Sequence, residues 1–196
     1  AALGIFENHK FDLLNDSLKK HSNYGTYLPN KEKVSNKIIS AMANLGRSVV
    51  SSNKKILVNF SYAAGVLRFY DIKNGTLVHR KDAVVKPMNF KVKNDDYQLQ
   101  DGLGFLDASI SDNYVYALYS GEKENYNAPM PTASYVYKYD YQGNLKDVYH
   151  LDKAAFTLAV KNDDSQLFTI VDDPNSKIFV YNLKWVTLDD HQKVQA

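Results

Sequence analysis

The sequence contains no cysteine, and no stretch is apolar for the roughly 18 residues that suggest a membrane-spanning helix. Without cysteine there are no disulfides, thiolate zinc sites, iron–sulfur clusters or cysteine nucleophiles. The first six residues lack the basic and long apolar segments of a signal peptide. We therefore expect neither a transmembrane segment nor a signal peptide within these residues.

An excess of charge of either sign is also missing. The 24 basic and 22 acidic residues give a formal net charge of +2. This balance excludes a strongly basic nucleic-acid-binding protein and an acidic solvating tail. No nucleic acid is therefore expected among the partners.

Aromatic residues are abundant, with 15 tyrosines and 9 phenylalanines against one tryptophan. Tyrosine suits the pleated, half-exposed surface of a sheet, so this composition favours strands over helices. The 44% hydrophobic and 23% charged residues are typical of a soluble globular protein and exclude disorder. The length fits a single domain over residues 1–196.

Apolar and aromatic runs separated by turn residues predict antiparallel hairpins. Three pairs of runs carry this pattern: 56–60 with 66–70, 114–119 with 135–139, and 166–171 with 178–181. A further strand candidate precedes each pair, at 47–50, 105–110 and 156–160. Helical spacing is convincing nowhere. Residues 31–45 could form a helical turn, but Ser35 and Asn36 interrupt it.

A repeat organises these runs. In each copy an aromatic residue is followed by Asp or Asn, then by a polar turn and a leucine. The four copies are Phe11-Asp12 with Leu18, Tyr70-Asp71 with Leu77, Tyr139-Asp140 with Leu145, and Tyr181-Asn182 with Leu188. The pattern indicates a strand that ends in Tyr-Asp, a turn, and a following strand that begins near the leucine.

Each of the last three copies ends a unit of four strands. Four antiparallel strands in a unit of this size are typical of a β-propeller blade. The sequence therefore predicts an all-β protein, a β-propeller of four-stranded antiparallel blades, with about three complete blades and part of another. A β-sandwich ranks second because it would not need the repeat. A closed ring needs further blades, so we expect missing N-terminal blades or self-association to close it.

Two strand pairs carry a resemblance to a known family. The segments Tyr-Val-Tyr-Ala-Leu-Tyr-Ser-Gly at 114–121 and Tyr-Val-Tyr-Lys-Tyr-Asp-Tyr-Gln-Gly-Asn-Leu at 135–145 resemble the TolB-like six-bladed β-propeller proteins of Bacteroides and relatives. The resemblance implies a six-bladed ring of which this chain is the C-terminal part. It also implies an exported protein, periplasmic or anchored to the outer membrane as a lipoprotein. No activity is established for the family as a class, so it supplies no catalytic residues.

Motifs for catalysis and cofactors are weak. Ser-x-x-Lys occurs three times and Ser111-Asp112-Asn113 matches Ser-Asp-Asn, but no Lys-Thr-Gly completes the set of a β-lactamase. Asn-Asp-Asp runs at 94–96 and 162–164 offer oxygens to calcium, yet they lack alternating carboxylates and turn chemistry explains them. We expect no catalytic residue, no cofactor and no metal in this chain.

The longest hairpin loop is the first candidate for binding. It spans 14 residues, 120–133, and loops of this length are usually functional or disordered. In a propeller it would join a blade's second and third strands, on the rim that carries the linkers between blades. Lys123 could supply polar contact, and Tyr126 and Met130 apolar contact. A tolerated insertion is the alternative.

Arg47 and Asp107 form the second candidate. Both fall in or beside strands predicted to be innermost, which line the central channel of a propeller. They could face water or a ligand there, or they could pair with each other as structure. We interpret the chain as a non-catalytic binding or scaffold module of the bacterial envelope, with a protein or glycan partner. The alternative is a propeller enzyme, a glycan lyase or hydrolase, with catalytic residues partly in missing blades.

Overall fold

The computed structural model describes residues 2–3, 10–14, 17, 20–94, 96–123, 130–171 and 176–183. Within these residues the chain is mostly β-strand, with one short helix. The elements are β1 (Ala2–Leu3), β2 (Phe11–Leu14), β3 (Lys20–Tyr24), α1 (Lys37–Ala43), β4 (Gly46–Val50), β5 (Ile56–Ser61), β6 (Gly65–Lys73), β7 (Thr76–Lys86), β8 (Phe90–Lys93), β9 (Asp96–Leu99), β10 (Phe105–Ile110), β11 (Tyr114–Tyr119), β12 (Ala133–Asp140), β13 (Leu145–Val160), β14 (Gln166–Val171) and β15 (Lys177–Asn182).

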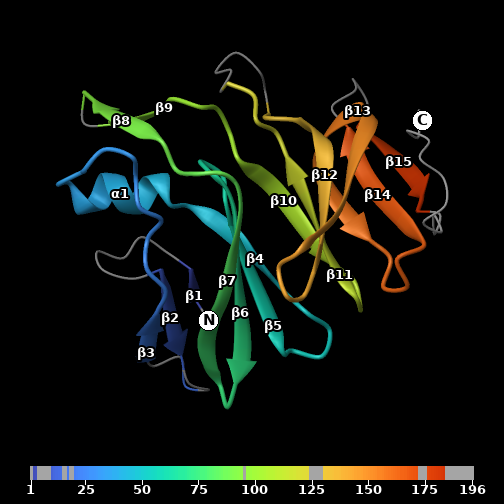
Figure 1. Ribbon diagram of the computed structural model, residues 1–196, viewed down its shortest axis with the longest axis horizontal. Coiled ribbons are helices and arrows are strands. Elements are labelled where there is room, and N and C mark those ends of the chain that lie inside the picture. The colour runs from blue at the N-terminus through green and yellow to red at the C-terminus, as the bar shows by residue number, and fades with distance from the viewer. Residues whose placement is uncertain are drawn as a thin grey trace.

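The strands form antiparallel sheets that lie side by side, in chain order from blue to red (Figure 1). Strands β1 to β3, β4 to β7 and β10 to β15 each pair in the order of the sequence. Sheets of consecutive antiparallel strands, repeated around an axis, are the architecture of a β-propeller. The structure therefore confirms the all-β prediction and defines a partial β-propeller.

One long strand, β13, belongs to two blades. Its first part pairs with β12 at Tyr135↔His150, and its last part pairs with β14 at Val160↔Leu167. The outer strand of one blade thus continues directly into the inner strand of the next. The sequence predicted separate strands here, whereas the short connection between them is extended enough to join them into one.

The three predicted hairpins are confirmed as β5–β6, β11–β12 and β14–β15, with registers such as Val58↔Phe69 and Ala117↔Tyr137. The predicted inner strands are confirmed as β4, β10 and the end of β13. Within the described residues two blades have all four strands: the sheet β4 to β7, and the part of the six-stranded sheet from β10 to the start of β13. The leucine expected to open a fourth strand after β15, Leu188, lies outside the described residues.

The repeated Tyr-Asp ends β12, as predicted, whereas β6 continues two residues beyond Asp71 to Lys73. Tyr70 and Tyr139 are each 3% exposed, so the aromatic residue of the repeat faces a core. Asp140 accepts hydrogen bonds from the backbone N–H of Gln142 at 3.0 Å and Asn144 at 2.8 Å, which closes the turn. Asp71 instead lies within β6 and pairs with Arg80 on β7, so this acidic residue links two strands rather than closing the turn.

Helix α1 corrects the sequence prediction, which found no convincing helix and allowed only an interrupted helical turn within residues 31–45. Asn36 does not interrupt the helix but caps it: its Oδ1 accepts hydrogen bonds from the N–H groups of Ile38 at 3.0 Å and Ile39 at 3.2 Å. Ile39 and Ala43 face the core with Phe90 of β8. Seven residues are too short for a clear helical period, so the cap and the buried face carry the helix.

A hairpin inserted between two blades was not predicted as such. The two segments that carry the Asn-Asp-Asp runs have different structures: Asn94 and Asp96 of the first run belong to hairpin β8–β9, and the run at 162–164 lies in the turn from β13 to β14. Asn94 turns the insert with a φ of 53°, a conformation that asparagine tolerates. The insert packs beside α1 at one end of the β4–β7 sheet (Figure 1).

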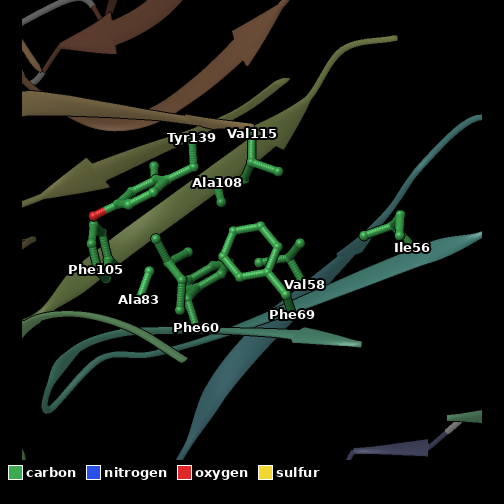
Figure 2. Close-up of a cluster of buried hydrophobic side chains, with 11 residues drawn as sticks. Ile56, Val58, Phe60, Phe69, Ala83, Phe105, Ala108, Val115 and Tyr139 are labelled. Atoms are coloured by element: carbon green, nitrogen blue, oxygen red, sulfur yellow. The ribbon is translucent and has the colours of Figure 1, made fainter. Parts of the chain in front are cut away.

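The main core lies between the two complete blades. Figure 2 shows Val58, Phe60 and Phe69 from one sheet facing Phe105 and other residues from the next. These four side chains are fully buried. Close packing of large aromatic side chains between sheets fixes how one blade sits against its neighbour. The ends of the inner strands are thereby held in a defined arrangement.

Candidate functional site

A cleft of about 410 Å³ lies where three blades and the insert meet. Blade β4–β7 contributes Arg47 from β4 and the turn between β5 and β6, and the insert contributes strand β9. The next blade contributes the start of β10 and the end of the long loop, and the following blade contributes β13. The described lining residues are Arg47, Tyr62, Ala63, Tyr97, Leu99, Leu103, Leu106, Met130, Pro131 and Phe156.

Arg47 and Asp107 meet beside this cleft. The Arg47 Nη1 donates to Asp107 Oδ1 at 3.3 Å, which joins the inner strands β4 and β10. The Arg47 side chain is 63% exposed, whereas that of Asp107 is 8% exposed. The pair that the sequence left open is therefore formed, with the cation toward solvent and the carboxylate behind it.

Asp107 is also bound to the following blade. Its Oδ2 accepts hydrogen bonds from the Thr157 hydroxyl and from the backbone N–H of Leu158, the latter at 3.1 Å. Both donors lie on the part of β13 that is the inner strand of the next blade. One carboxylate thus ties three inner strands together, and this network orients Arg47.

Tyr62 forms the wall of the cleft next to Arg47. It lies in the turn between β5 and β6, and its ring meets that of Phe60 edge to face with centroids 6.0 Å apart. Burial raises the pKa of the Tyr62 hydroxyl above its ordinary value, and the positive charge of Arg47 opposes that rise. The hydroxyl therefore stays protonated at neutral pH and remains a hydrogen-bond donor.

The insert supplies the opposite wall. Tyr97 packs edge to face on Phe90, with ring centroids 5.9 Å apart. Asn30 holds Phe90 by accepting its backbone N–H at 2.9 Å and donating to its carbonyl at 2.8 Å. The loop before α1 therefore fixes the hairpin that carries Tyr97 and Leu99 into the cleft lining.

The start of the long loop is fixed against the linker that leads into β10. Leu103 donates its N–H to the Glu122 carbonyl at 2.7 Å and accepts from the Gly121 N–H at 3.0 Å. Lys86 donates to the carbonyls of Asp101, Gly102 and Leu103 at 2.7 to 3.0 Å. Burial lowers the pKa of Lys86, and the charge of Asp101 opposes that effect. Loop and linker thus lie on the same rim, as the blade architecture predicts.

The five candidate residues fall in different places. Arg47 and Met130 line the cleft, and Asp107 lies behind Arg47. Lys123 is exposed on the loop but is not part of the cleft lining. Tyr126 lies outside the described residues. The structure therefore brings together three of the five, and a role for any of them in binding stays a prediction.

Sequence reasoning missed Tyr62, Tyr97 and Phe156, which supply the aromatic surface of the cleft. Tyr62 ends a hairpin strand and Phe156 begins an inner strand, so their position on the rim could have been inferred from blade topology. Tyr97 could not, because the insert follows no blade pattern.

A second hollow, of about 550 Å³, lies among the loop before α1, the helix and Phe90. Its described lining includes no inner strand and none of the described candidates Arg47, Asp107, Lys123 and Met130. The cleft is the better candidate because three blades and the long loop converge on it.

The Ser-Asp-Asn motif at 111–113 and the Asn-Asp-Asp run at 162–164 are part of turns. Ser111 Oγ accepts hydrogen bonds from the N–H groups of Asn113 at 3.2 Å and Tyr114 at 2.9 Å. Asp164 is 3% exposed and accepts from the Tyr116 hydroxyl at 3.0 Å and the Asn113 amide at 2.9 Å. In the part of the chain that the structure describes, no three His, Cys, Asp or Glu residues gather as a metal site would require.

Consecutive four-stranded blades with a cleft on their shared rim define this chain as part of a β-propeller. It belongs to the TolB-like 6-blade propeller-like family, whose model matches residues 1–163. The resemblance seen in the sequence is thereby confirmed. No curated protein matches the chain.

Among solved structures, a proposed 6-phosphogluconolactonase of Bacteroides uniformis is similar over 88% of this chain and 46% of its own, at 10% identity and a TM-score of 0.51. A proposed 6-phosphogluconolactonase of Bacteroides fragilis is similar over 72% of this chain and 36% of its own, at 14% identity and a TM-score of 0.48. The Cps50 (Swd1) β-propeller domain of Myceliophteria thermophila is similar over 70% of this chain and 40% of its own, at 12% identity and a TM-score of 0.47. The chain spans less than half the length of each, and these likenesses concern the fold alone.

Within the described ranges, no helix has the length and apolar character needed to cross a membrane.

Proposed function

We propose that this chain is a non-catalytic binding or scaffold module that uses the cleft and the adjoining rim to hold a protein or glycan partner. The observation that carries the proposal is Arg47: an exposed guanidinium fixed by Asp107 at the edge of an aromatic cleft. Loops placed on a rigid propeller commonly carry binding sites, and a cleft of this size is typical of ligand sites.

The rest of the proposal concerns the whole protein. The family model describes a six-bladed propeller, so we propose that residues 1–196 contribute to one ring together with further blades or a second copy. We place the protein in the bacterial cell envelope, as an exported protein or lipoprotein, on the basis of the family. Separation of soluble and membrane fractions of the producing cells tests this placement, and a purely cytosolic protein would contradict it.

A glycan lyase or hydrolase would need several carboxylates or histidines facing the channel. Asp107 is the carboxylate that the sequence placed there, and its two oxygens bind Arg47, Thr157 and Leu158. This arrangement supports a structural carboxylate rather than a general acid or base.

The proposal is tested by binding of the immobilised protein to an envelope extract of the producing cells. Arg47→Gln should reduce the bound material at least about fivefold, since charge-assisted contacts contribute about 1 kcal/mol or more. Lys123→Gln should reduce it less, because Lys123 lies on the rim outside the cleft lining.

Lys146→Gln is the matched control, because Lys146 is exposed on an outer strand and pairs with Asp140 away from the cleft. Equal binding by the wild type and the Arg47 and Lys123 variants would refute the proposed site.

A further inference from the structure

The composition of the cleft narrows the kind of ligand it can take. Most of its described lining is apolar or aromatic, from Leu99, Leu103 and Leu106 to Met130 and Phe156. Arg47 is the one charged residue among these described lining residues. Aromatic residues, methionine and arginine are the side chains enriched at the cores of protein–protein interfaces.

Arg47 has hydrogen-bonding capacity left for a ligand. A guanidinium has five N–H donors in a fixed plane, of which Asp107 takes up Nη1 and the Tyr62 hydroxyl oxygen accepts another. Because Asp107 is itself held by β13, the guanidinium is oriented before any ligand arrives. A preoriented arginine loses little conformational entropy on binding a second carboxylate.

A sugar fits this lining less well than an apolar side chain does. Each hydroxyl on a sugar ring needs a polar partner in the cleft or loses the hydrogen bonds it made with water. The polar side chains of the described lining are Arg47, Tyr62 and Tyr97, whereas the remaining lining side chains have no hydrogen-bonding N or O atom. Leucine and methionine instead gain from burying another apolar group.

We propose that the cleft binds an extended segment of a partner protein that places an apolar side chain among the leucines and Met130 and a neighbouring carboxylate on Arg47. This inference rests on the proposed binding function and narrows it from protein or glycan to an acidic, apolar peptide segment. The charge of the ligand is set by Arg47 and its shape by the walls from three blades and the insert.

The test is an NMR titration of the full chain with three small probes. These are N-acetyl-Leu-Glu-Phe-amide, the same peptide with Gln in place of Glu, and trigalacturonate as an acidic glycan. We expect the Glu peptide to shift backbone amides around Tyr62, Leu103 and Met130. The Gln peptide should bind about tenfold more weakly, the value for one lost charge-assisted contact of about 1.4 kcal/mol.

Two variants separate the parts of the site. Arg47→Gln should remove the preference for Glu over Gln, and its amide spectrum reports whether the fold is kept. Met130 lies on the loop and is 47% exposed. Met130→Gln should weaken the binding of both peptides by the same factor, so that the preference for Glu over Gln is kept. A preference that survives Arg47→Gln overturns the assignment of the carboxylate to Arg47.

Two results would overturn the ligand class. Stronger shifts at the cleft with trigalacturonate than with the Glu peptide would assign the cleft to an acidic glycan and leave the binding function intact. No shift at the cleft with either peptide would refute the peptide segment. Failure of the binding function itself is recognised separately, by envelope binding that is indifferent to Arg47.

Discussion

The carboxylate of Asp107 accepts a hydrogen bond from the backbone N–H of Leu158 at 3.1 Å, across two adjacent inner strands that are 51 residues apart in sequence. The same carboxylate binds Arg47 on the inner strand of the preceding blade. A single side chain therefore links the inner strands of three blades beside the cleft. Its loss should affect both the stability of the fold and the geometry of the site.

Asp107→Ala should lower the free energy of unfolding by about 1–3 kcal/mol, because it leaves the buried N–H of Leu158 without its acceptor and Arg47 without its anchor. Urea unfolding followed by circular dichroism measures the change. Asp112→Asn is the control, because Asp112 is exposed and contacts the exposed Ser52. Equal stability of the two variants would show that Asp107 does not tie the blades together.

Lys10 should destabilise the fold in a way that depends on pH. It is 2% exposed and its Nζ makes no hydrogen bond within the described residues. Burial, reinforced by the charge of Arg68 and opposed by that of Asp82, lowers the pKa of the Lys10 ammonium from 10.5 to about 7. The Nε2 atom of His79 forms a 2.8 Å hydrogen bond with Oδ1 of the same Asp82.

Because the folded chain releases this proton at lower pH than the unfolded chain, the wild-type free energy of unfolding should rise between about pH 7 and 10.5. It should not change through Lys10 below that window. Lys10→Met should remove the rise and stabilise the protein at pH 7 by on the order of 3 kcal/mol. Urea unfolding at pH 6, 7, 8 and 9 tests this, and parallel curves for both proteins would contradict it.

Tyr116 and Asp164 form a second link between blades. The buried Tyr116 hydroxyl donates to Asp164 in the turn that enters β14, and burial together with the Asp164 charge raises the pKa of Tyr116. Tyr116→Phe should cost about 1–2 kcal/mol, because Asp164 loses a donor while the ring keeps its packing. Tyr135→Phe, at an exposed tyrosine, is the control for thermal unfolding. An unchanged melting temperature for Tyr116→Phe would show that the bond contributes nothing.

Gly104 allows two blades to approach closely in front of β10. A Cβ at this position would lie 2.0 Å from the Ala64 carbonyl oxygen, and the Gly104 N–H donates to the Tyr62 carbonyl at 2.6 Å. Gly104→Ala should therefore cost on the order of 3 kcal/mol. Gly75→Ala meets no atom within 4 Å and should cost about 1 kcal/mol from its positive φ alone. Equal costs in urea unfolding would contradict the close approach.

The blades could be predicted from the sequence because their strands carry alternating apolar and aromatic residues between turn residues, and because Tyr70 and Tyr139 mark the same point of a repeat. The insert and α1 could not, because they follow no blade pattern and the helix has seven residues. Arg47 could be placed near the channel from its inner strand. The position of Tyr97, which lines the same cleft, depends on a hairpin that the repeat does not contain.

The contact between Asp107 and β13 also depends on tertiary structure. The sequence shows that both strands are innermost, but their relative shift along the axis is set by packing of side chains such as Leu106 and Leu158 between these two blades. The 3.1 Å hydrogen bond from the Leu158 N–H to Asp107 therefore depends on that packing and cannot be predicted from a local sequence pattern.

Photo-crosslinking in the producing cells tests the central claim, that the cleft is the binding site, most directly. A p-benzoylphenylalanine at position 130 is compared with one at position 78, since Met130 and Val78 are 47% and 44% exposed. Val78 lies on the outer strand β7 and is not part of the cleft lining. We predict a discrete crosslinked species from position 130 whose yield Arg47→Gln reduces at least about fivefold, and none from position 78. No species from position 130, or the same species from both positions, would contradict the account.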